Sequence, residues 1–138
     1  MGGMSDTRDR INEYIRRFGE DRGLVLDALD EQGGTQVARG SATVRINMIE
    51  EHGVLLLIAP IMKVPEKNAE AFYRRLLELS FLATSDAAFA IDKNTDMAYL
   101  RILRRLEGLD YEEFDDLLHT IAGVADEWDE KLKMLFGD

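Results

Sequence analysis

The chain has 138 residues, with 27 acidic and 17 basic side chains, no cysteine and a net charge of −10 at pH 7. This length suits a single domain, 1–138, with its own hydrophobic core, and the missing cysteines exclude disulfides and thiolate metal sites. An acidic surface disfavours nucleic acid as a partner. Because no stretch of 18 apolar residues occurs, we expect no membrane-spanning helix and no membrane partner. These features predict a cytoplasmic protein.

The first 41 residues begin with a short predicted helix. Within residues 7–18 an apolar stripe has helical spacing, and Gly19 or Gly23 can end it; the stripe is Ile11, Tyr14, Ile15 and Phe18. We interpret the ambiguous segment 24–32, LVLDALDEQ, as a strand, and residues 35–41 as a short polar strand or a loop. Residues 1–6 are expected to be disordered or a cloning remnant, with Met4 as a candidate natural start.

The middle of the chain predicts two strands and a helix. Residues 42–49, ATVRINMI, alternate apolar and polar side chains, which indicates a half-buried strand. Residues 54–62 return as a second strand, and Leu55 to Met62 are all apolar. Pro60 lacks an N–H and therefore belongs at an edge or a bulge. A helix is expected to start at Val64-Pro65-Glu66, and its apolar ridge is Ala69, Phe72, Leu76 and Leu79, with Tyr73 and Leu77 alongside.

The last third predicts a hairpin and a long acidic helix. Residues 87–92 and 97–106 form the two arms, joined by KNT. The helix opens at Asp110, with Glu113 three residues later as in a capping box. Its apolar positions continue at helical spacing to Leu135. Strands joined by short turns and helices set apart from them indicate an α+β fold with an antiparallel sheet.

No residue pattern predicts a catalytic site, a metal site or a cofactor. DKNTD, residues 92–96, opens like a calcium loop, but Met97 and Leu103 stand where that loop needs glycine and glutamate, so we interpret it as a hairpin turn. His52 and His119 have no partner at metal-ligand spacing and are expected at the surface. The adjacent acidic pairs, such as Glu112/Glu113, are interpreted as a solvated helix face.

A cluster of basic and aromatic residues is a weaker candidate. Arg101, Arg104 and Arg105 lie close in sequence to Tyr99 and Tyr111, as in proteins that bind single strands of nucleic acid. In a chain with a net charge of −10, pairing with the neighbouring acidic helix is the favoured interpretation.

The strand that is apolar on both faces leaves two explanations open. One is a central strand covered by helices. The other is a surface covered by a second subunit or by a partner peptide.

The sequence from Val54 to Asp92, followed by Met97 to Leu132, resembles the YbjN family, which is similar in fold to the CesT-type class I chaperones of type III secretion. Residues 41–135 carry the resemblance. Its matching features are Ala59-Pro60-Ile61-Met62, Leu76-Leu77-Glu78-Leu79, Phe89-Ala90-Ile91-Asp92 and Leu109-Asp110. Relatives often have asparagine where this chain has Ser80.

The resemblance implies an α-β-β-β-α-β-β-α order, no enzymatic activity and a homodimer formed through the middle helix and neighbouring strands. It further implies a chaperone or adaptor that binds an extended segment of a client protein by strand addition and apolar pockets. The alternative is a regulatory dimer of YbjN type with no unfolded client. The predicted dimer or partner surface is Val54, Leu56, Ile58, Ile61, Phe72, Leu76 and Leu79, and Asp at Phe72 or Leu76 is expected to break the dimer.

Overall fold

The computed structural model describes residues 3–137 of the chain. Within these residues, three α-helices and five strands follow one another in the predicted order, which confirms the α+β fold. Their bounds are α1 (Gly3–Arg22), β1 (Gly34–Arg39), β2 (Ala42–Ile49), β3 (Val54–Lys63), α2 (Ala69–Leu82), β4 (Ala88–Asp92), β5 (Met97–Arg105) and α3 (Tyr111–Phe136), with a 3-10 turn at Glu50–His52 between β2 and β3.

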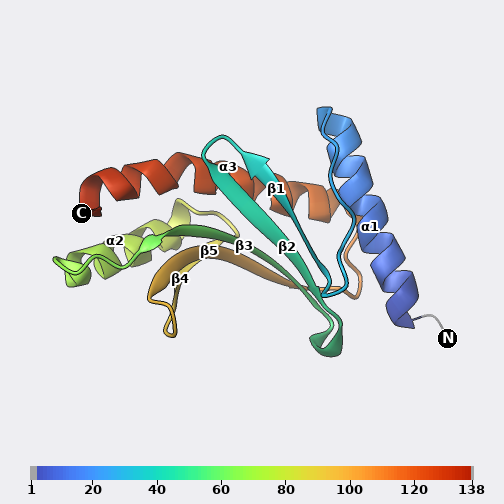
Figure 1. The fold of residues 1–138 in the computed structure, drawn as a ribbon, viewed down its shortest axis with the longest axis horizontal. Helices are drawn as coiled ribbons and strands as arrows, with labels where there is room; N and C mark the ends of the chain where they lie inside the picture. Colours follow the sequence, from blue (N-terminus) through green and yellow to red (C-terminus); the bar gives the residue numbers. More distant parts are fainter. Residues whose placement is uncertain (1–2, 138) are drawn as a thin grey trace.

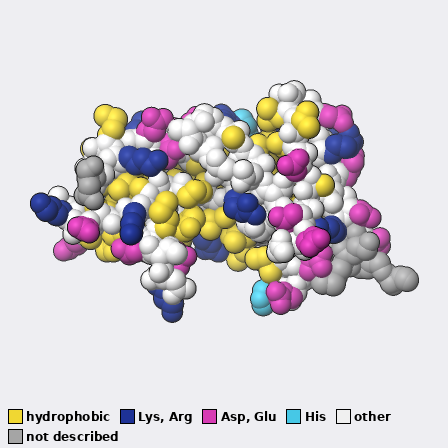
Figure 2. All heavy atoms as spheres, in the orientation of Figure 1, with side chains coloured by type: hydrophobic (Ala, Val, Ile, Leu, Met, Phe, Trp, Pro, Cys, Tyr) yellow, Lys and Arg dark blue, Asp and Glu magenta, His cyan; other side chains and the backbone are white. Residues whose placement is uncertain are grey.

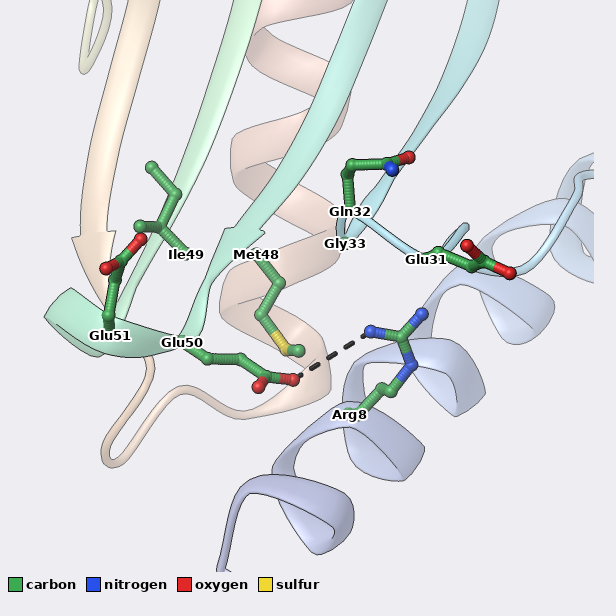
Figure 3. A pocket seen from close by; sticks show the side chains of 8 residues that line it. All are labelled: Arg8, Glu31, Gln32, Gly33, Met48, Ile49, Glu50 and Glu51. Carbon is green, nitrogen blue, oxygen red and sulfur yellow. Dashed lines mark ion pairs between the residues drawn. The ribbon is translucent and has the colours of Figure 1, made fainter.

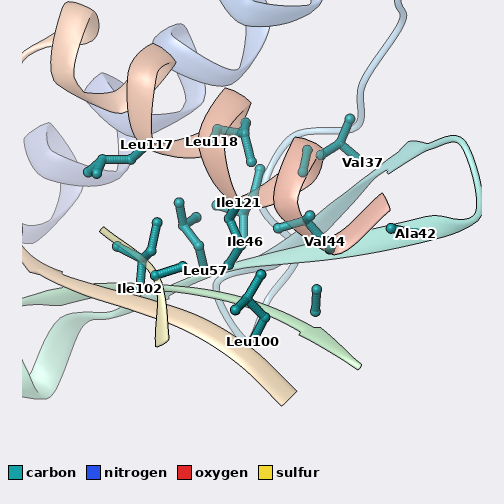
Figure 4. Close-up of a cluster of buried hydrophobic side chains, with 14 of the residues drawn as sticks. Val37, Ala42, Val44, Ile46, Leu57, Leu100, Ile102, Leu117, Leu118 and Ile121 are labelled. Carbon is teal, nitrogen blue, oxygen red and sulfur yellow. The ribbon is translucent and has the colours of Figure 1, made fainter. Parts of the chain in front are cut away.

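The strands form one antiparallel sheet in the order β1-β2-β3-β5-β4. Helix α3 lies along one face of this sheet, with α1 near its start and α2 near its end (Figure 1). Side chains of α3 such as Leu117, Leu118 and Ile121 meet the inward side chains of the strands in the core (Figure 4). No helix of the described residues covers the opposite face of the sheet (Figure 1).

Strand β3 shows how the two-faced apolar run is used. Leu55, Leu57 and Ala59 are buried on the face under α3, while Leu56 and Ile58 are half-buried on the opposite face. The register with β5 shifts between Pro60 and Met62, so the proline lies at a bulge as predicted. The first explanation left open by the sequence therefore applies to the face of β3 under α3, and the second stays a prediction for the opposite face.

Three sequence predictions differ from the structure. Residues 24–30 are extended but form no strand, because their only ladder-like bond joins the Asp30 N–H to the Gly34 carbonyl (2.8 Å). Helix α2 begins at Ala69 rather than near Pro65, since the Val64 N–H still bonds to the Asp96 carbonyl (2.9 Å). The structure also places residues 3–6 in α1, whereas residues 1–2 lie outside the described part of the chain.

The start of α3 follows the prediction and gives a simple test of it. The Asp110 carboxylate accepts a hydrogen bond from the Glu113 N–H (2.8 Å), and Asp110 has the extended backbone of an N-cap. We expect Asp110→Ala to lower the free energy of unfolding by about 1 kcal/mol. Asp110→Asn keeps the acceptor oxygen, so in urea denaturation it should remain within a few tenths of the wild type; an equal loss in both variants would contradict the capping role.

Candidate functional site

Backbone groups at both edges of the sheet are bonded in part. At the β4 edge, the Phe89 N–H donates to Ser80 Oγ of α2 (3.1 Å). At the β1 edge, Gly34 bonds outward through its N–H and its carbonyl to Asp30. In an antiparallel pair, every second residue of an edge strand points its N–H and carbonyl away from the neighbouring strand. Like those of Gly34, the backbone groups of Gln36 and Ala38 therefore face outward. No residue in the described chain bonds to these groups. The second half of β1 is therefore an open edge.

A groove of about 280 Å³ runs along this open edge, between the end of α1, strand β1 and the middle of α3. We name it the β1-edge groove. Its floor is apolar, with Phe18, Leu24, Val37 and Ala122, and the remaining lining residues are Arg22, Ala38, Arg39 and His119. Val37 is 4% exposed and lies at the margin of the core (Figure 4). An apolar cleft beside free backbone groups is suited to an extended peptide.

The cations at the rim of the β1-edge groove are paired differently. Arg22 Nη1 lies 2.7 Å from Asp115 Oδ1, and its guanidinium lies over the Phe18 ring at 3.8 Å. Arg39 Nη1 instead lies 3.2 Å from His119 Nδ1, and no carboxylate of the described residues forms an ion pair with it. Arg39 is thus the rim cation whose charge is still available to a partner.

Helix α1, which contributes Phe18 and Arg22 to the groove, is held against the start of α3 and the loop before it. Tyr14 donates to the Leu109 carbonyl (2.9 Å), and the Tyr111 hydroxyl donates to Asp21 Oδ2 (2.7 Å) with the Arg17 guanidinium over its ring. Burial, followed by the hydrogen bond to Asp21, raises the pKa of Tyr111 to about 12. The neutral phenol is therefore favoured at neutral pH, which keeps this contact intact.

The turn between β1 and β2 is held from α3. The Ser41 N–H donates to Asp126 Oδ1 (3.1 Å), and its hydroxyl lies 2.8 Å from Asp129 Oδ1. Asp129 is buried, at 2% exposure, and its carboxylate is satisfied by this contact together with the Glu130 N–H, which donates to Oδ1 (2.7 Å). Since the turn follows Arg39 directly, these bonds also fix the end of the open edge.

A second exposed surface is apolar. On α2, a stripe at helical spacing points away from the core; we call Tyr73, Leu77 and Phe81 the α2 stripe, with exposures of 40%, 72% and 82%. On the uncovered face of the sheet, Leu56 of β3 faces Leu103 of β5. Figure 2 shows hydrophobic side chains gathered over α2 and the neighbouring strands. A patch of this kind typically marks an interface.

The seven residues predicted from sequence divide between surface and core. Val54, Leu56 and Ile58 are half-buried on the uncovered face of β3, and their role in a dimer stays a prediction. Ile61, Phe72, Leu76 and Leu79 are 0–4% exposed and lie in the core of this chain, so placing them on a surface was wrong. The reason is that α2 has two apolar stripes, and the one chosen packs inward, where the Phe72 ring meets Phe136 of α3 at 5.4 Å.

The β1-edge groove was not found from the sequence, because its walls come from residues far apart in the chain. One signal was present in β1. Thr35, Val37 and Arg39 share one strand face, so two residues that pack inward are followed on that face by an exposed arginine.

A polar hollow lies at the other end of β2, between Glu50 and α1 (Figure 3). Arg8 points toward Glu50, with Nη1 3.8 Å from Oε1, and it also donates to the Leu29 carbonyl (3.1 Å). Next to it, hydrogen bonding from the Gly34 N–H lowers the pKa of Asp30. A general acid at neutral pH needs a raised carboxyl pKa. The pKa of Asp30 is lowered instead, so this carboxyl does not fit that role.

The other candidates from sequence have structural roles. Asp92 closes the hairpin turn by accepting bonds from the N–H groups of Asn94 (2.9 Å) and Asp96 (2.7 Å). Within residues 3–137, no three acidic, histidine or cysteine side chains are grouped so as to hold a metal ion. Arg104 lies near Asp86 (3.3 Å) and Glu113 (3.8 Å), which confirms its expected pairing with the acidic helix. No described helix is both long and apolar enough to cross a bilayer.

The order of elements and the sheet topology define a class, the small α+β proteins with the fold of type III secretion chaperones. Within that class, the model of the Tir chaperone protein (CesT) family matches residues 13–129, and the chain belongs to this family. The match confirms the resemblance found in the sequence, and it begins within α1 rather than at residue 41. A comparison with curated protein sequences finds no match.

Solved structures share the fold at low sequence identity. A chain of the ExsC–ExsE complex aligns with a TM-score of 0.71 and 22% identity, over 91% of this chain and 95% of that one. A chain of the ExoU–SpcU complex from the type III secretion system of Pseudomonas aeruginosa has a TM-score of 0.64 and 17% identity, over 91% and 97%. YbjN from E. coli has a TM-score of 0.61 and 14% identity, over 86% and 91%.

Proposed function

We propose that the protein is a non-enzymatic chaperone or adaptor of the bacterial cytoplasm, which binds an extended segment of a partner protein as a homodimer. The observation that carries the proposal is the open edge of β1 beside the β1-edge groove. An added strand gains backbone hydrogen bonds from Gln36 and Ala38, while its alternate side chains enter the apolar cleft. Support comes from the family and from similar folds in chaperone–effector complexes, such as the HopA1–SchA complex.

The homodimer has a separate basis in the proposal. The α2 stripe and the uncovered face of β3 and β5 leave apolar side chains in water, and a second copy would cover them. This surface differs from the β1-edge groove, so a dimer can keep both of its grooves accessible to partners.

A regulatory dimer without an unfolded client is the second candidate. The structural similarity to YbjN favours it. The two candidates differ in one respect that can be measured: the client-binding protein needs the β1 edge, whereas the regulatory dimer does not.

Ala38 allows the edge to be tested by itself. Ala38→Pro removes the outward N–H and puts a ring where an added strand would lie, whereas Ala38→Thr keeps the N–H at the same exposed position. We expect affinity capture from the host, followed by mass spectrometry, to recover a stoichiometric partner with wild type and the threonine variant, and at least tenfold less with the proline variant. Equal recovery by both variants, with equal thermal stability, would remove the edge from the proposal and favour the regulatory dimer.

A further inference from the structure

Resting on the proposed function, we infer that the β1-edge groove selects extended segments in which an apolar residue and an acidic residue are separated by one position, the acidic side chain binding at Arg39 and His119. The occupant is thus a partner segment of defined chemistry, apolar-x-acidic or acidic-x-apolar. The two orders correspond to the two directions in which a strand can be added to β1.

The spacing follows from the geometry of β1. Val37 and Arg39 are two residues apart and point to the same face of the sheet, toward α3. In an added strand, the residues opposite them point to that face as well, and they are also two apart. One therefore meets the apolar floor at Phe18, Leu24 and Val37, and the other meets the Arg39 guanidinium.

The preference for an acidic residue in the partner follows from the surroundings of Arg39. Its guanidinium lies 3.2 Å from His119 Nδ1 and 3.5 Å from the His119 carbonyl, and within the described chain it has no ion pair with a carboxylate. Helix α3 is rich in acids, yet on the side that faces β1 its acidic residues are engaged elsewhere: Asp115 with Arg22, and Asp126 and Asp129 with Ser41. An acidic side chain from a partner would supply the missing charge at the edge of an apolar cleft, where screening is weaker than in open solvent.

The positive charge of Arg39 also determines which partner segments are rejected. A lysine opposite Arg39 would place two cations together, which is unfavourable in the same cleft. The long-range field of a protein with a net charge of −10 repels acidic segments, so the preference for an acid is local. It should therefore depend on position within the segment rather than on the total charge of the segment.

The test uses a phage-displayed library of random 12-residue peptides, selected in parallel on the wild-type protein, on Arg39→Glu and on Lys67→Glu. The last variant makes the same change in net charge at an exposed residue away from the groove. We expect wild type and Lys67→Glu to enrich Asp or Glu two positions from an apolar residue, and Arg39→Glu to enrich Lys or Arg there. One selected peptide is then synthesised with Asp, Asn or Lys at that position, and the affinity of each version is measured by fluorescence anisotropy. We expect the Asn peptide to bind about threefold more weakly than the Asp peptide.

Other results would overturn the inference in distinguishable ways. Selection of alternating apolar peptides with no charge preference, or a preference that Arg39→Glu leaves unchanged, removes the acidic residue but keeps the peptide-binding edge. Selected peptides that bind Ala38→Pro equally well lie elsewhere on the molecule. A shift of oligomeric mass in Arg39→Glu would make a second copy the occupant. If folded protein enriches no peptide at all, the inference is wrong, and the partner capture with Ala38→Pro still judges the proposed function independently.

Discussion

Replacing Phe72 with Asp is expected to unfold the monomer rather than only separate two subunits. Phe72 is fully buried and contacts Phe136 of α3. Truncating a buried phenylalanine to alanine costs about 3–5 kcal/mol, and a carboxylate in the same place adds the cost of burying a charge. Since a domain of this size has about 5–15 kcal/mol of stability, Phe72→Asp leaves little of it.

Urea denaturation followed by circular dichroism measures this loss, with Leu77→Asp as the matched control. Leu77 lies five residues further along α2 and is 72% exposed, so its substitution adds the same charge to the same helix outside the core. We expect the two variants to differ in the free energy of unfolding by at least about 3 kcal/mol. A Phe72→Asp protein as stable as Leu77→Asp would mean that α2 does not pack in this orientation.

Sequence reasoning was sufficient for several features of the sheet. The alternation in residues 42–49, the continuous apolar strand and the hairpin were predictable because burial on one or both faces of a sheet leaves a period-two or unbroken pattern. The bulge was predictable from Pro60, which cannot donate to a ladder. Each of these signals is contained within one element.

The predictions that failed depended on how the helices and strands pack against one another. Helical periodicity shows that α2 has two apolar stripes, but only the position of α3 decides that Phe72 packs inward and Leu77 outward. The segment 24–30 has the residues of a strand, yet Leu29 and Asp30 are held by Asn12 and Arg8 of α1, and only Asp30 bonds to the β1 backbone, at Gly34. The β1-edge groove was missed for the same reason, since Phe18, Val37 and Ala122 meet only in the folded chain.

The double variant Leu77→Asp/Phe81→Asp is expected to convert a dimer to monomers without unfolding them. Both side chains are mostly exposed, so the monomer loses little, whereas in a two-fold symmetric dimer each substitution occurs twice. Burying a leucine or phenylalanine side chain contributes about 1.5–3 kcal/mol. Even partial burial of four such side chains accounts for about 4 kcal/mol, which corresponds to a dissociation constant raised about a thousandfold.

Sedimentation equilibrium over a range of protein concentrations measures this change, and Val25→Asp/Ala28→Asp is the control with the same added charge. Val25 is fully exposed and Ala28 is exposed, and both lie in the loop beside α1, away from the α2 stripe. The control should keep the dimer mass, because added negative charge alone does not address the interface. A dimer that survives in the α2 double variant would move the interface to another surface, and a monomeric wild type would remove the dimer from the proposal.

Because the α2 stripe and the β1-edge groove are separate, the monomeric variant should still select the same peptides, so assembly and partner binding can be judged one at a time.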